Sequence, residues 1–408
     1  MSGFYNDAFS QKTVSSTSLL TSRKKLYIIL CIVGGFAILS STISKNPVLP
    51  LFAERLGVSG AELGFIASAS TIPGIIISLP AGSLSDLIGR RKVILISLTI
   101  FATAPLLYFF VSTAWQLSLV RFYHGFATAI FGPVAQATIA ELYPRRKGER
   151  MSIFSSATIV GRSIAPFLGG TLIYTSGILS VYLAAGVSGV MSFLFGLLIY
   201  NIFKDGKSRS QGSEKSIFSG WKVLLGNIHV ILISYTEAIA RFTFGAFEYF
   251  LVLYAEKVGL NSFQIGLIAG SQLLTTLTTK PLIGWLSDRT RRGYLIALGL
   301  LITGLSLLLT SMADTFLQLL LIAICYGLGF SMVTSSTAPY VSDLISPDLY
   351  GSAMGLLSTI MDIGQTLGPI STGFVIAELS YAGGFHFLGL IAFFSSAIFA
   401  YIDFLRKS

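Results

Sequence analysis

Nine polar side chains stand inside long apolar stretches of the sequence, where each needs a partner. Their types allow ion pairing, anion binding and proton transfer. A charged group at the centre of a bilayer costs roughly 2.5–3.5 kcal/mol on insertion scales, so we expect these groups to face a bundle interior or a watery cavity. The nine are Lys45, Arg121, His124, Arg162, Glu237, Arg241, Glu248, Asp362 and Gln365.

Three of these residues form a stripe on one predicted helix. Glu237, Arg241 and Glu248 are separated by four and seven residues, which at 100° per residue places them within about 40° of one another. One interpretation is a helix-internal ion pair between Glu237 and Arg241 that only neutralises buried charge. The other is a polar stripe on a central cavity, with acids that exchange protons. The sequence leaves both open.

The remaining bases divide between cavity and rim. Arg121 and His124 are three residues apart and share a helix face, where the histidine either relays protons near neutral pH or is structural. Lys45, beside prolines near a helix end, is assigned equally to a cavity wall and to the rim. For Lys280, about two turns from a helix end, we favour a rim position that its long stem reaches.

The stretches that carry these residues are suited to a bilayer. Of 408 residues, 53% are hydrophobic and 11% charged, whereas soluble domains carry about 25% charged residues. Apolar runs recur near the ~20 residues that a helix needs to cross ~30 Å of hydrocarbon. The sequence predicts an all-α membrane protein with twelve transmembrane helices, near 25–50, 61–84, 92–112, 115–140, 150–174, 178–203, 225–255, 262–286, 294–313, 316–341, 350–377 and 381–405.

Basic residues gather on one side of these helices. The side of the two termini holds clusters such as RRK at 90–92, whereas the other side holds only Arg55 and Lys257. Because Lys and Arg mark cytoplasmic loops, we predict a multi-pass protein of the cell (plasma or inner) membrane with both termini cytoplasmic. The net charge of +10 is spread over short loops, which argues against a nucleic-acid partner.

The chain repeats itself. LFAERLGVSGAELGFIAS from Leu51 aligns with LYAEKVGLNSFQIGLIAG from Leu253, and matching glycines and acids continue at an offset of 202 or 203. Two six-helix bundles with the same topology are therefore predicted, related by an axis along the membrane normal. We expect a tail over 1–24, bundles over 25–203 and 225–405, a linker over 204–224, and a tail over 406–408.

Each half carries a charged loop after its second helix, GSLSDLIGRRK and GWLSDRTRRG. Glycine lets helices approach closely, and an aspartate beside arginines forms a charge-assisted latch. We expect these loops to act as gates. Their residues are Gly82, Asp86, Gly89, Arg90, Arg91, Gly284, Asp288, Arg289 and Arg292.

A glycine–proline segment also occurs once in each half, as GRSIAPFLGG and GQTLGPISTG, close to Arg162 and Asp362. Proline and glycine are tolerated in membrane helices that bend. We expect these helices to bend during gating, at Gly161, Pro166, Gly170, Gly364, Gly368 and Pro369.

The doubled loop resembles the signature of the major facilitator superfamily, from about Tyr27 to Phe404. Arg121 with Gly125, followed by AELYPRRKGER, is similar to the second motif of that family. GRSIAPFLGG is similar to the motif of its proton-antiporting exporters, with Ala165 in place of a glycine. The resemblance implies the twelve-helix fold and, most closely, the drug:proton antiporter branch.

We therefore expect a secondary active transporter that works by alternating access, with substrate bound between the halves. Proton-coupled efflux of an amphipathic compound or drug is the leading expectation. Proton-coupled uptake or exchange of an anionic carboxylate, and a non-transporting receptor, are the alternatives. No phosphate loop or catalytic constellation indicates an enzyme. We expect no cofactor and no metal, and a monomer with a small-molecule substrate, protons and lipid as partners.

Overall fold

The computed structural model describes residues 3–77, 85, 88–143, 146–202, 224–346 and 350–405, and all regular structure in these ranges is helical. The gaps include 203–223, so most of the expected linker lies outside the described residues. The first half contains α1 (Gly3–Ile43), α2 (Val48–Arg55), α3 (Gly60–Ala69), α5 (Arg90–Leu107), the short η1 (Tyr108–Phe110), α6 (Ala114–Leu142), α7 (Lys147–Ser176) and α8 (Ile178–Ile202). The second half contains α10 (Ile228–Lys257), α11 (Ser262–Arg289), α12 (Arg292–Thr310), α13 (Phe316–Leu344), α14 (Tyr350–Glu378) and α15 (Tyr381–Leu405).

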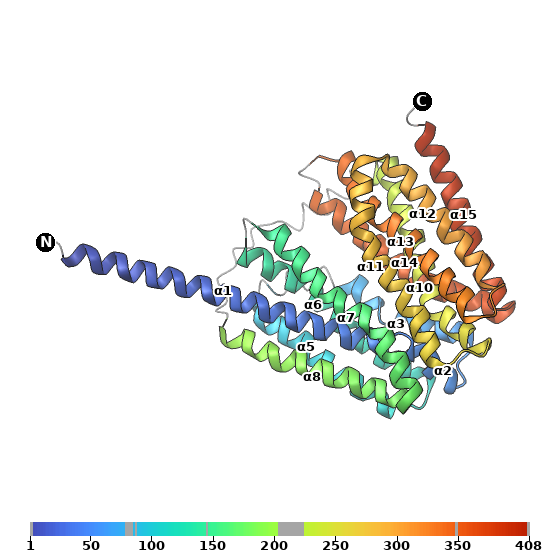
Figure 1. Cartoon of the computed structure of the whole chain (residues 1–408), viewed down its shortest axis with the longest axis horizontal. Helices are drawn as coiled ribbons and strands as arrows, with labels where there is room; N and C mark the ends of the chain where they lie inside the picture. Colours follow the sequence, from blue (N-terminus) through green and yellow to red (C-terminus); the bar gives the residue numbers. More distant parts are fainter. Residues whose placement is uncertain are drawn as a thin grey trace.

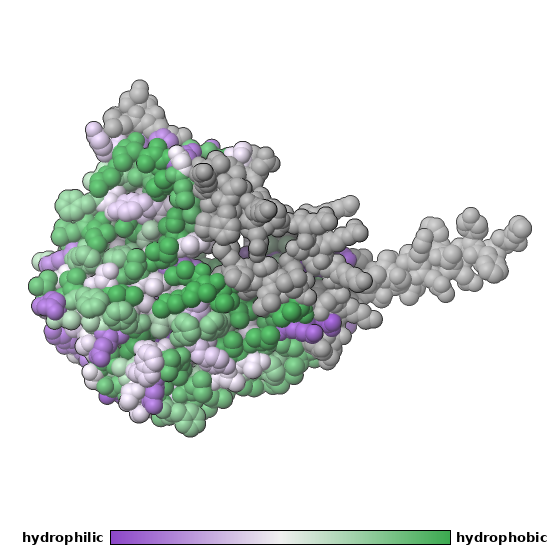
Figure 2. All heavy atoms as spheres, turned by 180° about the vertical axis from the view of Figure 1, so that it is seen from behind, coloured by the Kyte–Doolittle hydropathy of each residue, from purple (hydrophilic) through white to green (hydrophobic). Residues whose placement is uncertain are grey.

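The helices have the length and apolar surface of membrane spans. In the described ranges, nine segments are long and apolar enough to cross a bilayer. The long helices α6, α11 and α14 fall outside that group, and each contributes polar side chains to a central cavity. Apolar side chains also cover most of the coloured surface in Figure 2. The predicted all-α membrane fold is confirmed.

Three helix boundaries differ from the prediction. The helix expected at 25–50 breaks at 44–47, where Pro47 and Pro50 lack the N–H that would continue it. The helix expected at 61–84 is interrupted by a turn at Ser70 and Thr71, just before a proline. Helix α1 begins at Gly3, upstream of the expected start, because no glycine or proline stands between residues 4 and 33 to end it.

The two halves repeat each other in local detail. Gly57 and Gly259, 202 residues apart, both have positive φ, at 72° and 88°, a conformation that glycine adopts without a steric penalty. The helices that follow begin with the same reciprocal cap, made by Ser59 with Glu62 in α3 and by Asn261 with its partner in α11. These caps satisfy free N–H groups at the helix start in each half.

The halves touch through glycines at one end of the bundle. A Cβ on Gly64 of α3 would lie 2.4 Å from the carbonyl oxygen of Pro369 in α14, and a Cβ on Gly266 of α11 would lie 2.7 Å from that of Pro166 in α7. Figure 1 shows the helices of the two halves meeting around α2 and α3 and diverging toward the two termini. We call the meeting end the far side and the other end the termini side.

Candidate functional site

A cavity of about 460 Å³ lies between the two halves. Its walls come from α1, α6 and α7 of the first half and from α10, α11, α13 and α14 of the second. Ser70 and Thr71, in the turn that interrupts the second helix, also line the cavity. The cavity is therefore shared by both halves, as a site that changes sides during rocking must be.

Polar contacts between the halves close the cavity toward the far side. The Lys45 ammonium in the first half lies 2.6 Å from a carboxylate oxygen of Glu248 on α10. The Asn46 amide donates to the backbone carbonyl of Glu248 at 3.5 Å. From α6, Arg121 donates across to the Tyr249 hydroxyl on α10 at 3.3 Å and, within the first half, to Ser70 at 2.5 Å.

The stripe on α10 combines both interpretations that the sequence left open. Arg241 donates to Glu237 at 3.1 Å, and the second carboxylate oxygen of Glu237 accepts from Thr337 on α13 at 2.5 Å. Arg241 also lines the cavity, where its guanidinium lies 5.3 Å from the ring centre of Phe330. Glu237, only 2% exposed, lies behind Arg241 and outside the cavity lining.

Two basic residues of the cavity form no direct ion pair among the residues that the structure describes. Arg162 on α7 and Lys280 on α11 line the cavity, and neither forms an ion pair among those found in the described ranges. Asp362 on α14 faces the same space. Among the described residues, five bases thus line the cavity against two acids, with Glu237 behind as a third, which gives a surplus of two positive charges when all eight are ionised.

His124 lies at the cavity wall one helical turn from Arg121. It is 2% exposed and packs edge-on against Phe101 and Tyr108, at centroid distances of 6.2 and 6.3 Å. Neither ring nitrogen has a hydrogen-bond partner among the described residues. Its imidazole therefore packs mainly as an aromatic ring in this arrangement.

The structure gathers most of the predicted residues around one space. Eight of the nine lie around the cavity, and Glu237 is behind it. The expected rim position of Lys280 is wrong, because the residue lies on the cavity face of α11. Sequence analysis also missed the aromatic wall, where Phe244 and Phe330 stack at 4.6 Å. Aromatic spacing alone gives no signal for such a wall, since most buried aromatics are core residues.

The expected gating loops lie on the termini side. In the first half, Arg90 lies 3.0 Å from Glu141, joining α5 to α6. Gly89 has a φ of 100° and precedes α5, while Gly82 and Asp86 lie outside the described residues. Arg91 also has an interaction partner.

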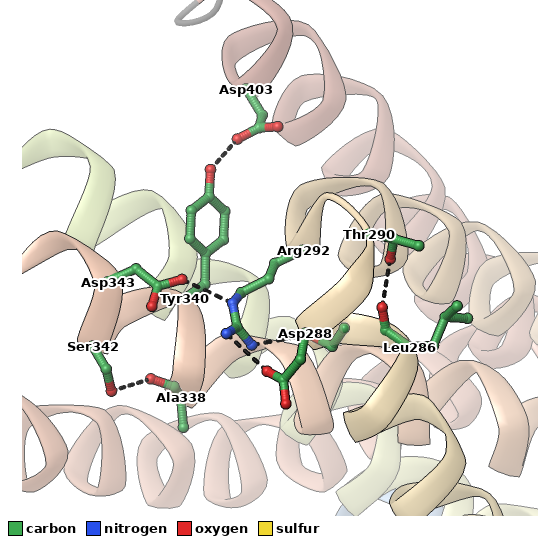
Figure 3. A network of polar contacts seen from close by, with 10 residues as sticks. Leu286, Asp288, Thr290, Arg292, Ala338, Tyr340, Ser342, Asp343 and Asp403 are labelled. Atoms are coloured by element: carbon green, nitrogen blue, oxygen red, sulfur yellow. Dashed lines mark hydrogen bonds and ion pairs between the residues drawn. The ribbon is translucent and has the colours of Figure 1, made fainter.

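The second half has a network of polar contacts at the same place, which Figure 3 shows. Arg292 at the start of α12 pairs with Asp288 at 2.9 Å and with Asp343 at 2.8 Å. Beside it, Tyr340 of α13 donates to Asp403 near the end of α15. Four helices, α11, α12, α13 and α15, are thereby joined at one end. Separately, the Arg289 guanidinium stacks 3.9 Å over the ring of Trp285, and Gly284 has open space around it.

The glycine–proline segments act as contact surfaces in this conformation. Helices α7 and α14 continue through Pro166 and Pro369. A Cβ on Gly161, Gly364 or Gly368 would lie 2.0–2.5 Å from a backbone oxygen of a neighbouring helix, and one on Gly170 would lie 2.6 Å from Gly266. Glycine there permits backbones to approach closely; bending at these positions stays a prediction.

The cavity offers charge and aromatic surface to a ligand. No group of three or more His, Cys, Asp or Glu side chains in the described ranges is placed to hold a metal ion. Arg162 and Lys280 can bind an anionic group, and Phe244 with Phe330 can pack against an apolar one. This combination suits a small amphipathic molecule held between the halves.

Solved structures with a similar fold are transporters. A bacterial homologue of the human lysosomal transporter Spinster, in an inward-facing unoccupied conformation, matches with a TM-score of 0.79 at 16% identity, over 94% of this chain and 96% of that one. A mutant of the nucleoside transporter NupG matches with a TM-score of 0.77 at 16% identity, over 94% of this chain and 100% of that one. At this identity the likeness shows the fold alone.

Sequence relatives point to the same family. An uncharacterized MFS-type transporter of Methanocaldococcus jannaschii is 28% identical, over 88% of this chain and 92% of that protein. The quinolone resistance protein NorA of Staphylococcus aureus is 27% identical, over 80% and 84%. The family model described as Major Facilitator Superfamily matches residues 30–261 and again 233–408. The chain therefore belongs to the major facilitator superfamily and is a secondary membrane transporter, not an enzyme.

Proposed function

We propose that this transporter exports an amphipathic compound across the cell membrane in exchange for protons, with both termini in the cytoplasm. The observation that carries the proposal is the shared cavity, in which ionisable side chains lie beside the Phe244–Phe330 wall. The similarity to the quinolone resistance protein NorA supports export of drug-like aromatic molecules. The basic clusters on the termini side support the orientation.

The acids of the site supply candidates for the proton. Glu248 and Asp362 line the cavity, and Glu237 lies behind Arg241, with which it forms an ion pair. A carboxylate that loses its cationic partner in such a site gains affinity for a proton. Movement of the halves changes which partners face each acid, so proton binding and substrate binding become linked.

A flux measurement tests this function. Purified protein in proteoliposomes should transport quinolones faster with an imposed pH gradient than without one, relative to protein-free vesicles. Equal protein-dependent rates under both conditions would count against proton coupling, and the absence of any protein-dependent flux would count against this substrate group.

A second candidate is uptake or exchange of an anionic metabolite. It is favoured by the surplus of positive charge around the cavity, and in particular by Arg162 and Lys280. Replacing Arg162 or Arg241 by alanine should then abolish carboxylate binding, measured by a ligand-induced rise in thermal stability. Unchanged binding in both variants would remove this candidate.

A further inference from the structure

The ion pair of Lys45 with Glu248 differs from the other ion pairs of the described residues because it joins the two halves. Its partners lie 2.6 Å apart, and their side chains are 19% and 4% exposed. The pairs Glu237–Arg241 and Arg90–Glu141 each lie within one half. An element that ties one half to the other is the kind of contact that rocking must break.

The pair lies where the two repeats meet. Asn46 and Glu248 are 202 residues apart, the offset of the repeat, and the Asn46 side chain donates to the Glu248 backbone. Lys45 corresponds to Phe247 at this offset. The contact of Asn46 with the Glu248 backbone therefore joins equivalent positions of the two halves. The Lys45 ammonium beside it has no counterpart in the second half, where Phe247 stands, so the ion pair breaks the symmetry of the repeat.

Opening the far side separates these two groups. Lys45 belongs to the first half and Glu248 to the second, beside the cross-half contacts of Ser68 and Thr71 with Thr366. Pulling the halves apart here would leave a carboxylate that is 4% exposed in this structure without its cation. Separation there exchanges the direct attraction between the two charges for hydration of each group, so the pair favours closure by as much as its attraction exceeds that hydration.

Lys45 also faces the cavity and is within reach of a ligand. Its ammonium lies 5.4 Å from the ring centre of Tyr249, and Lys45, Arg121 and Arg162 all line the same space. An anionic group bound there competes with Glu248 for Lys45. We propose that the Lys45–Glu248 ion pair is the latch of the far side, and that an anionic group on the substrate releases it by pairing with Lys45. The release step rests on the proposed transport of amphipathic compounds and narrows them to those with an anionic group.

Distances between spin labels can test the latch without any transport. Ser176 in α7 and Ala377 in α14 are exposed near the far-side ends of opposite halves. Cysteines placed there, in a chain with Cys31 and Cys325 replaced by alanine, would carry the labels for double electron–electron resonance in nanodiscs. The probes are 2-naphthalenesulfonate, an aromatic anion, and the neutral 2-naphthalenesulfonamide.

If the ion pair is the latch, the distance between the two spin labels should be longer in ligand-free Glu248→Gln than in the parent chain. The ratio of molecules open on the far side to molecules closed there should rise about tenfold. Lys45→Met should do the same, and the exchanged pair Lys45→Glu with Glu248→Lys should return toward the closed distance. Glu62→Gln is the control, because it neutralises a far-side carboxylate whose hydrogen bonds to Ser59 stay within the first half, and its distance should stay closed. Closed distances in both Glu248→Gln and Lys45→Met would overturn the latch.

The release step has its own outcome. In the parent chain 2-naphthalenesulfonate should lengthen the distance and the sulfonamide should not, and the anion should add nothing in Lys45→Met. Equal effects of both probes, or no effect of the anion while Glu248→Gln is open, would overturn release by an anion. Failure of quinolone flux alone would count against the proposed substrate group and leave the latch result standing.

Discussion

Alanine at Gly64 or Gly266 should force the two halves apart on the far side. The new Cβ atoms would lie 2.4 Å from the Pro369 carbonyl oxygen and 2.7 Å from the Pro166 carbonyl oxygen. Ordinary contact begins near 3.4 Å, so the backbones must separate by about 0.7–1 Å. Overpacking of this kind costs about 1–3 kcal/mol, which lowers the closed-to-open ratio by about 5- to 150-fold.

The spin-label distance between the far-side ends of α7 and α14 measures this ratio. Both substitutions should lengthen it, because the two glycines occupy equivalent places in the repeat. Gly132→Ala is the control, since a Cβ there meets nothing within 4 Å and alanine favours the helix. A closed distance in Gly64→Ala and Gly266→Ala, in protein that remains folded, would refute the assignment of these glycines to the closed contact.

Three further predictions concern the termini side. Tyr340→Phe removes a donor from the buried Asp403 and should lower the free energy of unfolding by about 1–3 kcal/mol, seen as a lower melting temperature; an unchanged value would contradict it. Arg292→Ala breaks two ion pairs with largely exposed aspartates, each worth about 0–1 kcal/mol, so its melting temperature should fall less than that of Tyr340→Phe, and the reverse order would contradict this ranking. A cysteine at Lys407, in a chain without other cysteines, should react with an impermeant maleimide only after cells are permeabilised, and reaction in intact cells would contradict cytoplasmic termini.

Much of the fold follows from the sequence because a bilayer restricts the options. Apolar runs of bilayer length must be helices, and glycines kept in phase at the repeat offset mark close approaches such as those of Gly64 and Gly266. The helix breaks are harder to place. Pro47 signals one of them, but the turn at Ser70 and Thr71 depends on how α3 packs, including the Ser70 backbone oxygen that a Cβ on Gly125 would meet at 2.3 Å.

The sequence predicts which residue types lie at the site, but it predicts fewer of the contacts between them. Spacing within α10 places Glu237 next to Arg241, because residues four apart are neighbours on a helix. Spacing cannot show that Lys45 meets Glu248, since that contact depends on how two distant helices cross. Lys280 departs from its expected rim position for a related reason: the sequence fixes how far it lies from the helix end but not which face of the helix it occupies.

The most direct test of the account is flux of 2-naphthalenesulfonate through proteoliposomes, because this anion stays ionised and does not redistribute as a neutral acid. We predict protein-dependent transport that an imposed pH gradient accelerates, and that Arg162→Ala in the cavity reduces at least about tenfold. A rate equal to that of protein-free vesicles, or one unaffected by both the gradient and the substitution, would contradict a cavity that binds anions and couples their movement to protons.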